Sequence, residues 1–191
     1  MSIPKRLTTM PLNSKDLRLR ARRIRLLLLD VDGVLTDGRI YYLPRSGGTF
    51  VESKTFHSRD GLGIRFAHEA GILTGIISGR GTPVVLHRAR ELGIRFIYQD
   101  ALEKLTPYAE ILRLTGLKNE DVCYIGDDLV DLPLLTRVGL AVSVKDGHPE
   151  LRRHVHYVTR NPGGKGAVRE AVDLILGAKG KLKPLLKRYI S

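Results

Sequence analysis

Short apolar runs alternate with amphipathic segments along most of this chain. Continuous apolar runs predict strands covered on both faces at Ile24–Asp30, Ile72–Ile77, Phe96–Tyr98, Val122–Ile125 and Leu140–Val142. Helical periodicity with glycine stops predicts helices at Gly61–Ala70, Pro83–Leu92, Ala101–Thr115, Leu129–Val138 and Gly166–Leu176, with helical turns in the tail beyond. Strands that alternate with helices form a parallel sheet with helices on both faces, so we expect an α/β fold with a doubly wound parallel sheet.

One segment departs from this alternation. Arg39–Leu43 and Thr49–Phe56 flank the sequence Pro44-Arg45-Ser46-Gly47-Gly48, which is rich in turn-forming residues. Two extended runs around such a loop predict a β-hairpin. The hairpin carries much apolar surface for a two-stranded unit, and such a unit is marginal by itself. We therefore expect a flap that pairs with another surface, with no second domain covering the sheet.

Composition and charge change this interpretation only at the ends of the chain. The 191 residues are 42% hydrophobic and 27% charged, which excludes disorder, collagen and coiled coil for the whole. The net charge of +12 lies entirely in residues 1–25 and 179–191. We divide the chain into a basic extension (1–23), a domain (24–178) and a basic tail (179–191). These ends are read as solvated, with nucleic acid or an anionic membrane as the alternative partner.

Features that would place the protein outside the cytoplasm are missing from the sequence. No apolar run approaches the roughly 20 residues of a membrane span. The apolar stretch that follows the basic N-terminus is short, ends in Asp30 and Asp32, and has no small-residue cleavage site. A single cysteine, Cys123, cannot form an internal disulfide or a four-ligand zinc site. We expect a cytoplasmic protein without a membrane span.

Two acidic clusters follow two of the predicted strands. Asp30 and Asp32 leave the end of the first strand on the same face, because residues i and i+2 of a strand do so. Asp127 and Asp128 follow Val122–Ile125, with Asp131 one helical turn later. A single cluster could serve turn or helix-capping chemistry. Two clusters at one sheet edge form a set of oxygen ligands suited to Mg²⁺, so we predict a magnesium site.

Two weaker signals follow the other strands. Ser78-Gly79-Arg80-Gly81 comes after Ile72–Ile77, and Lys104 comes after Phe96–Tyr98. A hydroxyl and free backbone N–H groups at a strand–helix turn can hold phosphate oxygens. By itself, the first segment is as typical of a plain turn as of a phosphate-binding turn. A lone lysine is usually exposed to solvent.

The order Asp-x-Asp, Ser, Lys and Gly-Asp-Asp-x-x-Asp, each after a strand, resembles the haloacid dehalogenase superfamily of aspartyl-phosphate phosphatases. The segments 54–65, Thr159-Arg160 and 163–170 are similar to one capless branch, the Kdo-8-phosphate phosphatases of lipopolysaccharide sugar synthesis. The resemblance covers roughly residues 25–178. It implies a Rossmann-like fold of that superfamily and hydrolysis of 3-deoxy-D-manno-octulosonate 8-phosphate. Alternatives are a nonulosonic (sialic-type) acid 9-phosphate phosphatase and a non-catalytic scaffold on the same fold.

The resemblance also implies a role for each residue. Asp30 is the nucleophile and Asp32 the general acid and then base, while Ser78, Gly79 and Lys104 bind the phosphoryl group. Asp30, the backbone carbonyl of Asp32 and Asp127 hold Mg²⁺, supported by Asp128 and Asp131. Contacts to the substrate as a whole are implied at Asp32, His57, Ser58, Arg59, Asp60, Gly61, Arg65, Arg80, Arg88 and Lys104.

Assembly is implied in the same way. The resemblance points to a homotetramer in which hairpins meet and a neighbour's hairpin walls the site. A neighbour's C-terminal tail, from about Gly177 onward, is expected to reach the site, where its lysines would suit an anionic substrate. The implied partner is a small sugar-acid phosphate, and no nucleic acid is expected.

Overall fold

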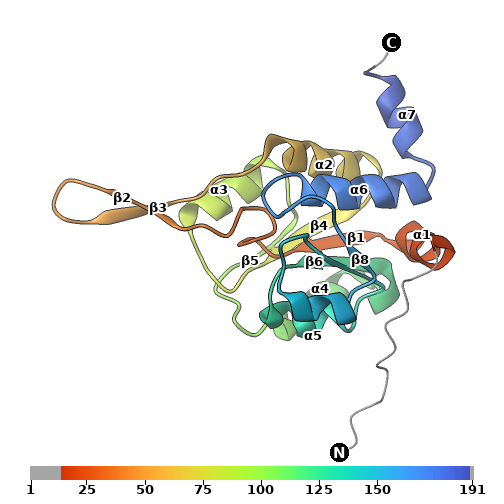
Figure 1. Ribbon diagram of the computed structural model, residues 1–191, viewed down its shortest axis with the longest axis horizontal. Helices are drawn as coiled ribbons and strands as arrows, with labels where there is room; N and C mark the ends of the chain where they lie inside the picture. Colours follow the sequence, from red (N-terminus) through yellow and green to blue (C-terminus); the bar gives the residue numbers. More distant parts are fainter. Residues whose placement is uncertain (1–13, 190–191) are drawn as a thin grey trace, which may run out of the picture.

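The computed structural model describes residues 14–189, whose largest element is a six-stranded parallel sheet with helices on both faces (Figure 1). In the order β5-β4-β1-β6-β7-β8, its strands are Phe96–Tyr98, Leu73–Ile77, Leu26–Leu29, Val122–Gly126, Leu140–Ser143 and Tyr157–Val158. The chain winds outward from β1 in both directions, so the carboxyl ends of β1 and β6 border the crevice where such sheets bind ligands. The predicted α/β fold with a doubly wound parallel sheet is confirmed.

Each face of the sheet has its own apolar core, because alternate side chains of a strand point to opposite faces. Leu27 and Leu29 pack with residues of α2 (Ser58–Glu69), α3 (Pro83–Glu91) and α6 (Ala167–Ala178). Leu26 and Leu28 pack with α4 (Leu105–Thr115) and α5 (Leu132–Leu135) on the other face (Figure 1). All four leucines are fully buried, which explains why β1 reads as a continuous apolar run.

The predicted hairpin is present and projects from the body of the molecule (Figure 1). Its strands β2 (Tyr41–Pro44) and β3 (Phe50–Ser53) pair antiparallel, with Tyr42 opposite Glu52. Both strands are shorter than expected. Apolar side chains along the hairpin face solvent in the single chain, and the exposed fractions of Tyr42 and Phe50 reach 60% and 66%.

One α-helix and one strand were missed by the sequence analysis. Helix α1 (Ser14–Arg23) lies in the segment that was read as a basic extension, and its Ala21 is fully buried in the core. Strand β8, at Tyr157–Val158, is too short to show a period. The basic residues Lys5 and Arg6 lie outside the described residues.

One predicted helix is shorter than expected, and the tail is partly helical. In place of a helix over Leu129–Val138, a 3₁₀ turn at Leu129–Asp131 leads into the four-residue α5. The predicted turns of the tail are α7 (Leu182–Lys187), which is held near α2 because Nζ of Lys181 donates to the carbonyl of Ala70 at 2.6 Å. Among the described residues, no helix has the length and hydrophobicity to cross a membrane.

Candidate active site

The site forms where β1 and β6 end side by side. The strands pair in register up to Leu29 and Ile125, and the backbone N–H of Asp30 still donates to the carbonyl of Ile125 at 3.0 Å. This places Asp30 beside the Asp127 that follows β6. Gly33 completes the approach: its φ is +82°, and a Cβ at this position would lie 2.0 Å from Oδ2 of Asp127. Glycine is therefore required for the two acidic loops to meet.

Lys104 enters this acidic site from the loop before α4. Its side chain is almost fully buried, and its Nζ lies 3.1 Å from Oδ1 of Asp30 and 2.7 Å from Oδ1 of Asp131. Burial alone lowers the pKa of Lys104, but attraction to the two carboxylates outweighs it and raises the pKa above its usual value. The lysine is therefore a permanent cation at the bottom of the site.

Asp131 is a supporting residue whose oxygens are fully used. Its Oδ1 accepts from Lys104 at 2.7 Å and from the Tyr124 hydroxyl at 2.6 Å. Its Oδ2 accepts from the backbone N–H groups of Asp127 and Asp128 at 2.9 and 3.3 Å. A carboxylate offers about four lone-pair positions, so these bonds saturate it. Asp131 therefore shapes the loop after β6 and orients Lys104.

The residues fit a divalent cation. Asp30, Asp127 and Asp131 each offer an oxygen, and these atoms lie within 4.8 Å of one another. Because Asp131 is saturated, the carboxylates left to bind a cation are Asp30 and Asp127. Oxygen ligands from few carboxylates are typical of Mg²⁺, which keeps several waters. Asp128 lies at the edge, where its side chain caps the following turn by accepting from the Leu129 N–H at 2.7 Å.

The protein alone holds these carboxyl groups at high pKa values. Burial, followed by the charge of Asp131, raises the pKa of Asp30 to about 6. Burial, followed by the charges of Asp30 and Asp131, raises the pKa of Asp127 to about 8. Carboxylates that repel one another in this way are relieved by a cation between them. Both pKa shifts therefore agree with a metal site at this position.

Asp30 and Asp32 point to different surroundings. Oδ1 of Asp30 accepts from the Val31 N–H at 2.7 Å and from Lys104, which leaves its second oxygen for chemistry or a cation. Asp32 lies two residues further along the loop, where its Oδ1 accepts from Nζ of Lys54. Lys54 was not singled out from the sequence as a site residue, because only the folded hairpin brings it to Asp32.

The predicted residues at the other strand ends line the same cavity. A hollow of about 240 Å³ is bordered by the acidic groups and by the loop after β4, and its lining consists of Asp30, Asp32, Gly38, Ser78, Gly79, Arg80, Lys104, Asp127, Asp128 and Val130. Ser78 is buried, and its hydroxyl lies within hydrogen-bond distance of both the N–H and the carbonyl of Arg80. Every residue predicted to bind phosphate or metal therefore lines this cavity except Asp131, which lies behind it in contact with Lys104.

Several of the residues expected around the substrate do not line this cavity. His57 caps α2 by accepting from the Arg59 N–H at 3.1 Å. Asp60 is buried and caps α6, accepting from the N–H groups of Gly166 and Arg169 at 3.0 and 2.8 Å. Arg88 pairs with Glu91 at 2.8 Å. Ser58 and Arg65 are exposed on α2, and Gly61 packs against Arg88.

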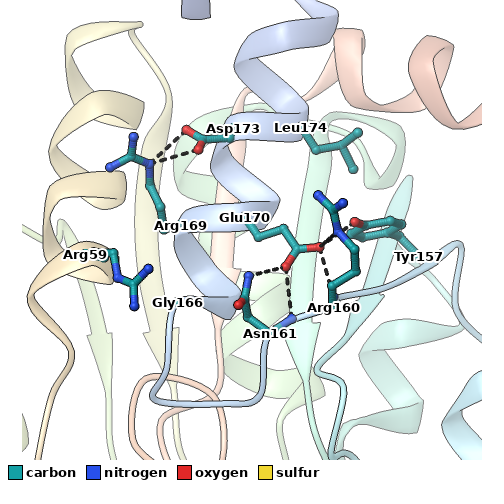
Figure 2. A pocket seen from close by; sticks show the side chains of 9 residues that line it. All are labelled: Arg59, Tyr157, Arg160, Asn161, Gly166, Arg169, Glu170, Asp173 and Leu174. Atoms are coloured by element: carbon teal, nitrogen blue, oxygen red, sulfur yellow. Dashed lines mark hydrogen bonds and ion pairs between the residues drawn. The ribbon is translucent and has the colours of Figure 1, made fainter. Parts of the chain in front are cut away.

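Arg59 lines a second cavity, of about 450 Å³, beside the start of α6 (Figure 2). The other side chains of that cavity are largely paired with one another. Nε of Arg169 lies 2.9 Å from Asp173, and Glu170 accepts from the hydroxyl of Tyr157 at 2.6 Å and from the side chain of Asn161 (Figure 2). The substrate roles of Arg59 and of the residues on α2 stay predictions.

Comparison with known proteins agrees with this geometry. A model of haloacid dehalogenase-like hydrolases matches residues 89–171. The chain is 47% identical over 169 residues to the 3-deoxy-D-manno-octulosonate 8-phosphate phosphatase KdsC of Escherichia coli strain K12, and the match covers 88% of each protein. The chain belongs to the haloacid dehalogenase-like hydrolases. The resemblance inferred from the four strand-end motifs is thereby confirmed.

Solved structures of this hydrolase family share the whole fold. The 3-deoxy-D-manno-octulosonate 8-phosphate phosphatase of Yersinia pestis is 48% identical, with a TM-score of 0.83 over 88% of this chain and 89% of that one. The enzyme of that name from Moraxella catarrhalis, solved with a magnesium ion, a phosphate ion and a KDO molecule, is 38% identical. Its TM-score is 0.86 over 92% of this chain and 98% of that one.

Proposed function

We propose that this hydrolase is a Mg²⁺-dependent phosphatase that converts 3-deoxy-D-manno-octulosonate 8-phosphate to the free sugar acid and phosphate. The observation that carries the proposal is the placement of Lys104, 3.1 Å from Asp30 and buried beside Asp131. A carboxylate, a fixed cation and a cation-binding pair of aspartates meet in one cavity open to solvent. The choice of sugar substrate is inferred from the names of the relatives, and the reaction type is inferred from the aspartates of the site.

Asp30 is proposed as the nucleophile. Its free carboxylate oxygen attacks phosphorus, a P–O bond forms, and the bond to the sugar oxygen breaks, which leaves an aspartyl phosphate. Lys104 and the N–H groups of the loop after β4 stabilise charge on the phosphoryl oxygens that do not react. Magnesium, when bound by Asp30, Asp127 and the carbonyl of Asp32, supplies further positive charge against those oxygens.

Asp32 is proposed as the group that moves protons. It donates a proton to the departing sugar oxygen, and then, as a carboxylate, accepts one from the water that attacks the aspartyl phosphate. Phosphate leaves, and Asp30 and Asp32 return to their starting states. An acid and a nucleophile two residues apart at one strand end are suited to act on opposite sides of phosphorus.

A panel of phosphate esters tests the choice of substrate. Phosphate release with Mg²⁺ is compared between the eight-carbon sugar acid 8-phosphate, a nine-carbon nonulosonic acid 9-phosphate and neutral sugar phosphates. The eight-carbon ester is expected to have the highest kcat/KM. A higher value for the nine-carbon ester would transfer the proposal to that substrate, and no release from any ester would leave only a scaffold function.

We also propose that the enzyme works in the cytoplasm as a homotetramer joined through its hairpins. The support lies in the apolar side chains that the hairpin and the residue before it expose, at Ile40, Tyr41, Tyr42, Leu43 and Phe50. Monomeric proteins rarely expose large contiguous apolar patches, and closed symmetric association would bury this one. The hairpin lies next to the site in the chain, so a neighbour's hairpin is placed to wall it.

A further inference from the structure

A closed ring of charges links Asp32 to the base of the hairpin. Nζ of Lys54 donates to Oδ1 of Asp32 and lies 3.0 Å from Oε1 of Glu52. Oε2 of Glu52 lies 3.0 Å from Nη2 of Arg80, and Nε of Arg80 lies 3.8 Å from Oδ2 of Asp32. Two cations therefore alternate with two carboxylates. The ring joins the loop after β1, the end of β3 and the loop after β4.

Lys54 is the most enclosed member of this ring. Its side chain is 0% exposed, compared with 24% for Asp32, 17% for Glu52 and 47% for Arg80. Burying an ammonium is costly unless it is paired and hydrogen-bonded, and here Asp32 accepts the hydrogen bond while Glu52 completes the ion pairing. Burial raises the pKa of Glu52, but the hydrogen bonds from Lys54 and Arg80 outweigh it and lower the pKa below its usual value.

The contact fixes how the carboxyl of Asp32 is turned. Oδ1 accepts from Lys54. Within residues 14–189, the charged group nearest to Oδ2 is Arg80, at 3.8 Å, and Asp32 lines the cavity. One oxygen is therefore anchored to the hairpin, and the other is left to exchange a proton with the leaving group. A general acid must lie within hydrogen-bond reach of the oxygen it protonates, so the orientation of the Asp32 carboxyl group matters for catalysis.

We propose that Lys54 is a positioning residue that holds the carboxyl of Asp32 in its proton-transfer orientation. This inference rests on the proposed phosphatase function. Lys54 does not touch the phosphoryl group; it acts through Asp32, and Glu52 keeps it in place. The base of the hairpin thereby contributes to proton transfer, in addition to any role of the hairpin in covering a neighbouring site.

The dependence of rate on the leaving group separates this role from a purely structural one. A sugar alkoxide needs a proton as it leaves, whereas dinitrophenolate leaves without one. The variant Lys54→Met keeps the length of the side chain and removes the cation. It is expected to lower the single-turnover rate of sugar release from the sugar-acid 8-phosphate by at least about 10²-fold. The single-turnover release of dinitrophenolate from 2,4-dinitrophenyl phosphate should slow by less than about tenfold, because forming the aspartyl phosphate from that ester needs no general acid.

A double-mutant cycle with Asp32→Asn tests whether Lys54 acts through Asp32. Asp32→Asn should show the same selective loss in this first step, and adding Lys54→Met to it should slow sugar release no further. Lys118→Met, an exposed lysine at the amino-terminal edge of the sheet, is the matched control. If Lys54→Met destabilises the fold, Lys54→Met with Glu52→Gln removes the leftover charge repulsion, and thermal denaturation checks that it folds.

The outcomes are distinct. Selective loss on the sugar ester, absent in the Asp32→Asn background, supports the proposal. Equal losses in the single-turnover release of both leaving groups, or a full additional loss in the Asp32→Asn background, would overturn it and leave Lys54 as an anchor of the hairpin. The wild-type rates on the two esters test the proposed function separately, since a chain that hydrolyses neither is not a phosphatase whatever Lys54 does.

Discussion

The ammonium of Lys104 lies 2.7 Å from Oδ1 of Asp131, although the two residues are 27 positions apart. Both are almost completely buried. A buried ion pair is tolerated when its remaining hydrogen-bond positions are filled, and the oxygens of Asp131 are saturated. The pair therefore ties the loop before α4 to the loop after β6 and sets the distance between Lys104 and the nucleophile.

Removing the nucleophile should abolish turnover without unfolding the protein. Asp30→Asn keeps the shape of the side chain but loses the attacking carboxylate and one charge at the metal site. The rate of phosphate release should fall by at least about 10³-fold. Steady-state assays with Mg²⁺ measure the loss, and circular dichroism confirms the fold.

A matched change shows that the effect belongs to the site. Asp121→Asn lies at the other edge of the sheet, where the carboxyl accepts from the Lys118 N–H at 3.0 Å, and an amide can still accept that bond. This variant should turn over like the wild type. Turnover of Asp30→Asn within tenfold of the wild-type rate would be incompatible with covalent catalysis at this residue.

Arg80 is expected to bind the carboxylate of the sugar acid. It is the arginine that lines the cavity with Asp30, and guanidinium groups bind carboxylates through paired hydrogen bonds. Arg80→Ala should raise KM for the sugar-acid ester by about tenfold or more, and should raise KM for phenyl phosphate, which has no carboxylate, by less. Arg90→Ala, exposed on α3, is the control, and equal KM changes for both esters would contradict the assignment.

The acidic cluster predicts how stability depends on pH and metal. Asp127 has a pKa of about 8 in the folded protein, against a usual 3.8. The folded state therefore holds a proton that the unfolded chain has lost, so the contribution of this group to stability falls as pH rises from about 4 to about 8. Asp30, at about 6, acts in the same direction.

Magnesium should reverse this loss, because it binds the deprotonated carboxylates and competes with their protons. The increase in Tm caused by Mg²⁺, relative to protein in EDTA, should be larger at pH 8 than at pH 5.5. Differential scanning fluorimetry at the two pH values measures it. A Tm increase that is the same at both, or larger at pH 5.5, would show that the cation does not bind at Asp30 and Asp127.

Light scattering can distinguish the mass of a homotetramer joined through the hairpins from the mass of a single chain. A homotetramer would have about four times the 21.3 kDa of one chain. Phe50→Asp, which places a charge on the exposed apolar strand β3, should shift the mass toward the single chain. A wild-type mass near 21.3 kDa at micromolar concentration would rule out the assembly.

The sequence sufficed for residues whose position follows from the strand that precedes them. Asp30 and Asp127 each follow a buried apolar run, and parallel strands bring their carboxyl ends to one edge. Ser78 could be placed in the same way. Lys104 needed the family resemblance, since nothing local distinguishes it from a solvated lysine.

Residues that depend on tertiary geometry could not be placed from the sequence. Lys54 reaches Asp32 only because the hairpin folds back onto the loop after β1. The family resemblance implied a substrate contact for Asp60, but nothing local in the sequence shows that its carboxyl caps a helix that begins more than a hundred residues later. The basic segment at 14–23 looked like a solvated end because charged residues dominate it. Its packing is decided by two buried residues, Ala21 and, directly after the segment, Ile24.

Direct capture of the covalent intermediate is the measurement that tests the central claim most closely. The enzyme is mixed with the sugar-acid 8-phosphate and Mg²⁺, quenched during turnover and reduced with borohydride, which converts an aspartyl phosphate to homoserine. Peptide mass spectrometry should find homoserine in place of Asp30, and only when substrate is present. Full phosphate release with an unmodified Asp30, or homoserine at Asp32 or Asp127 instead, would contradict this account.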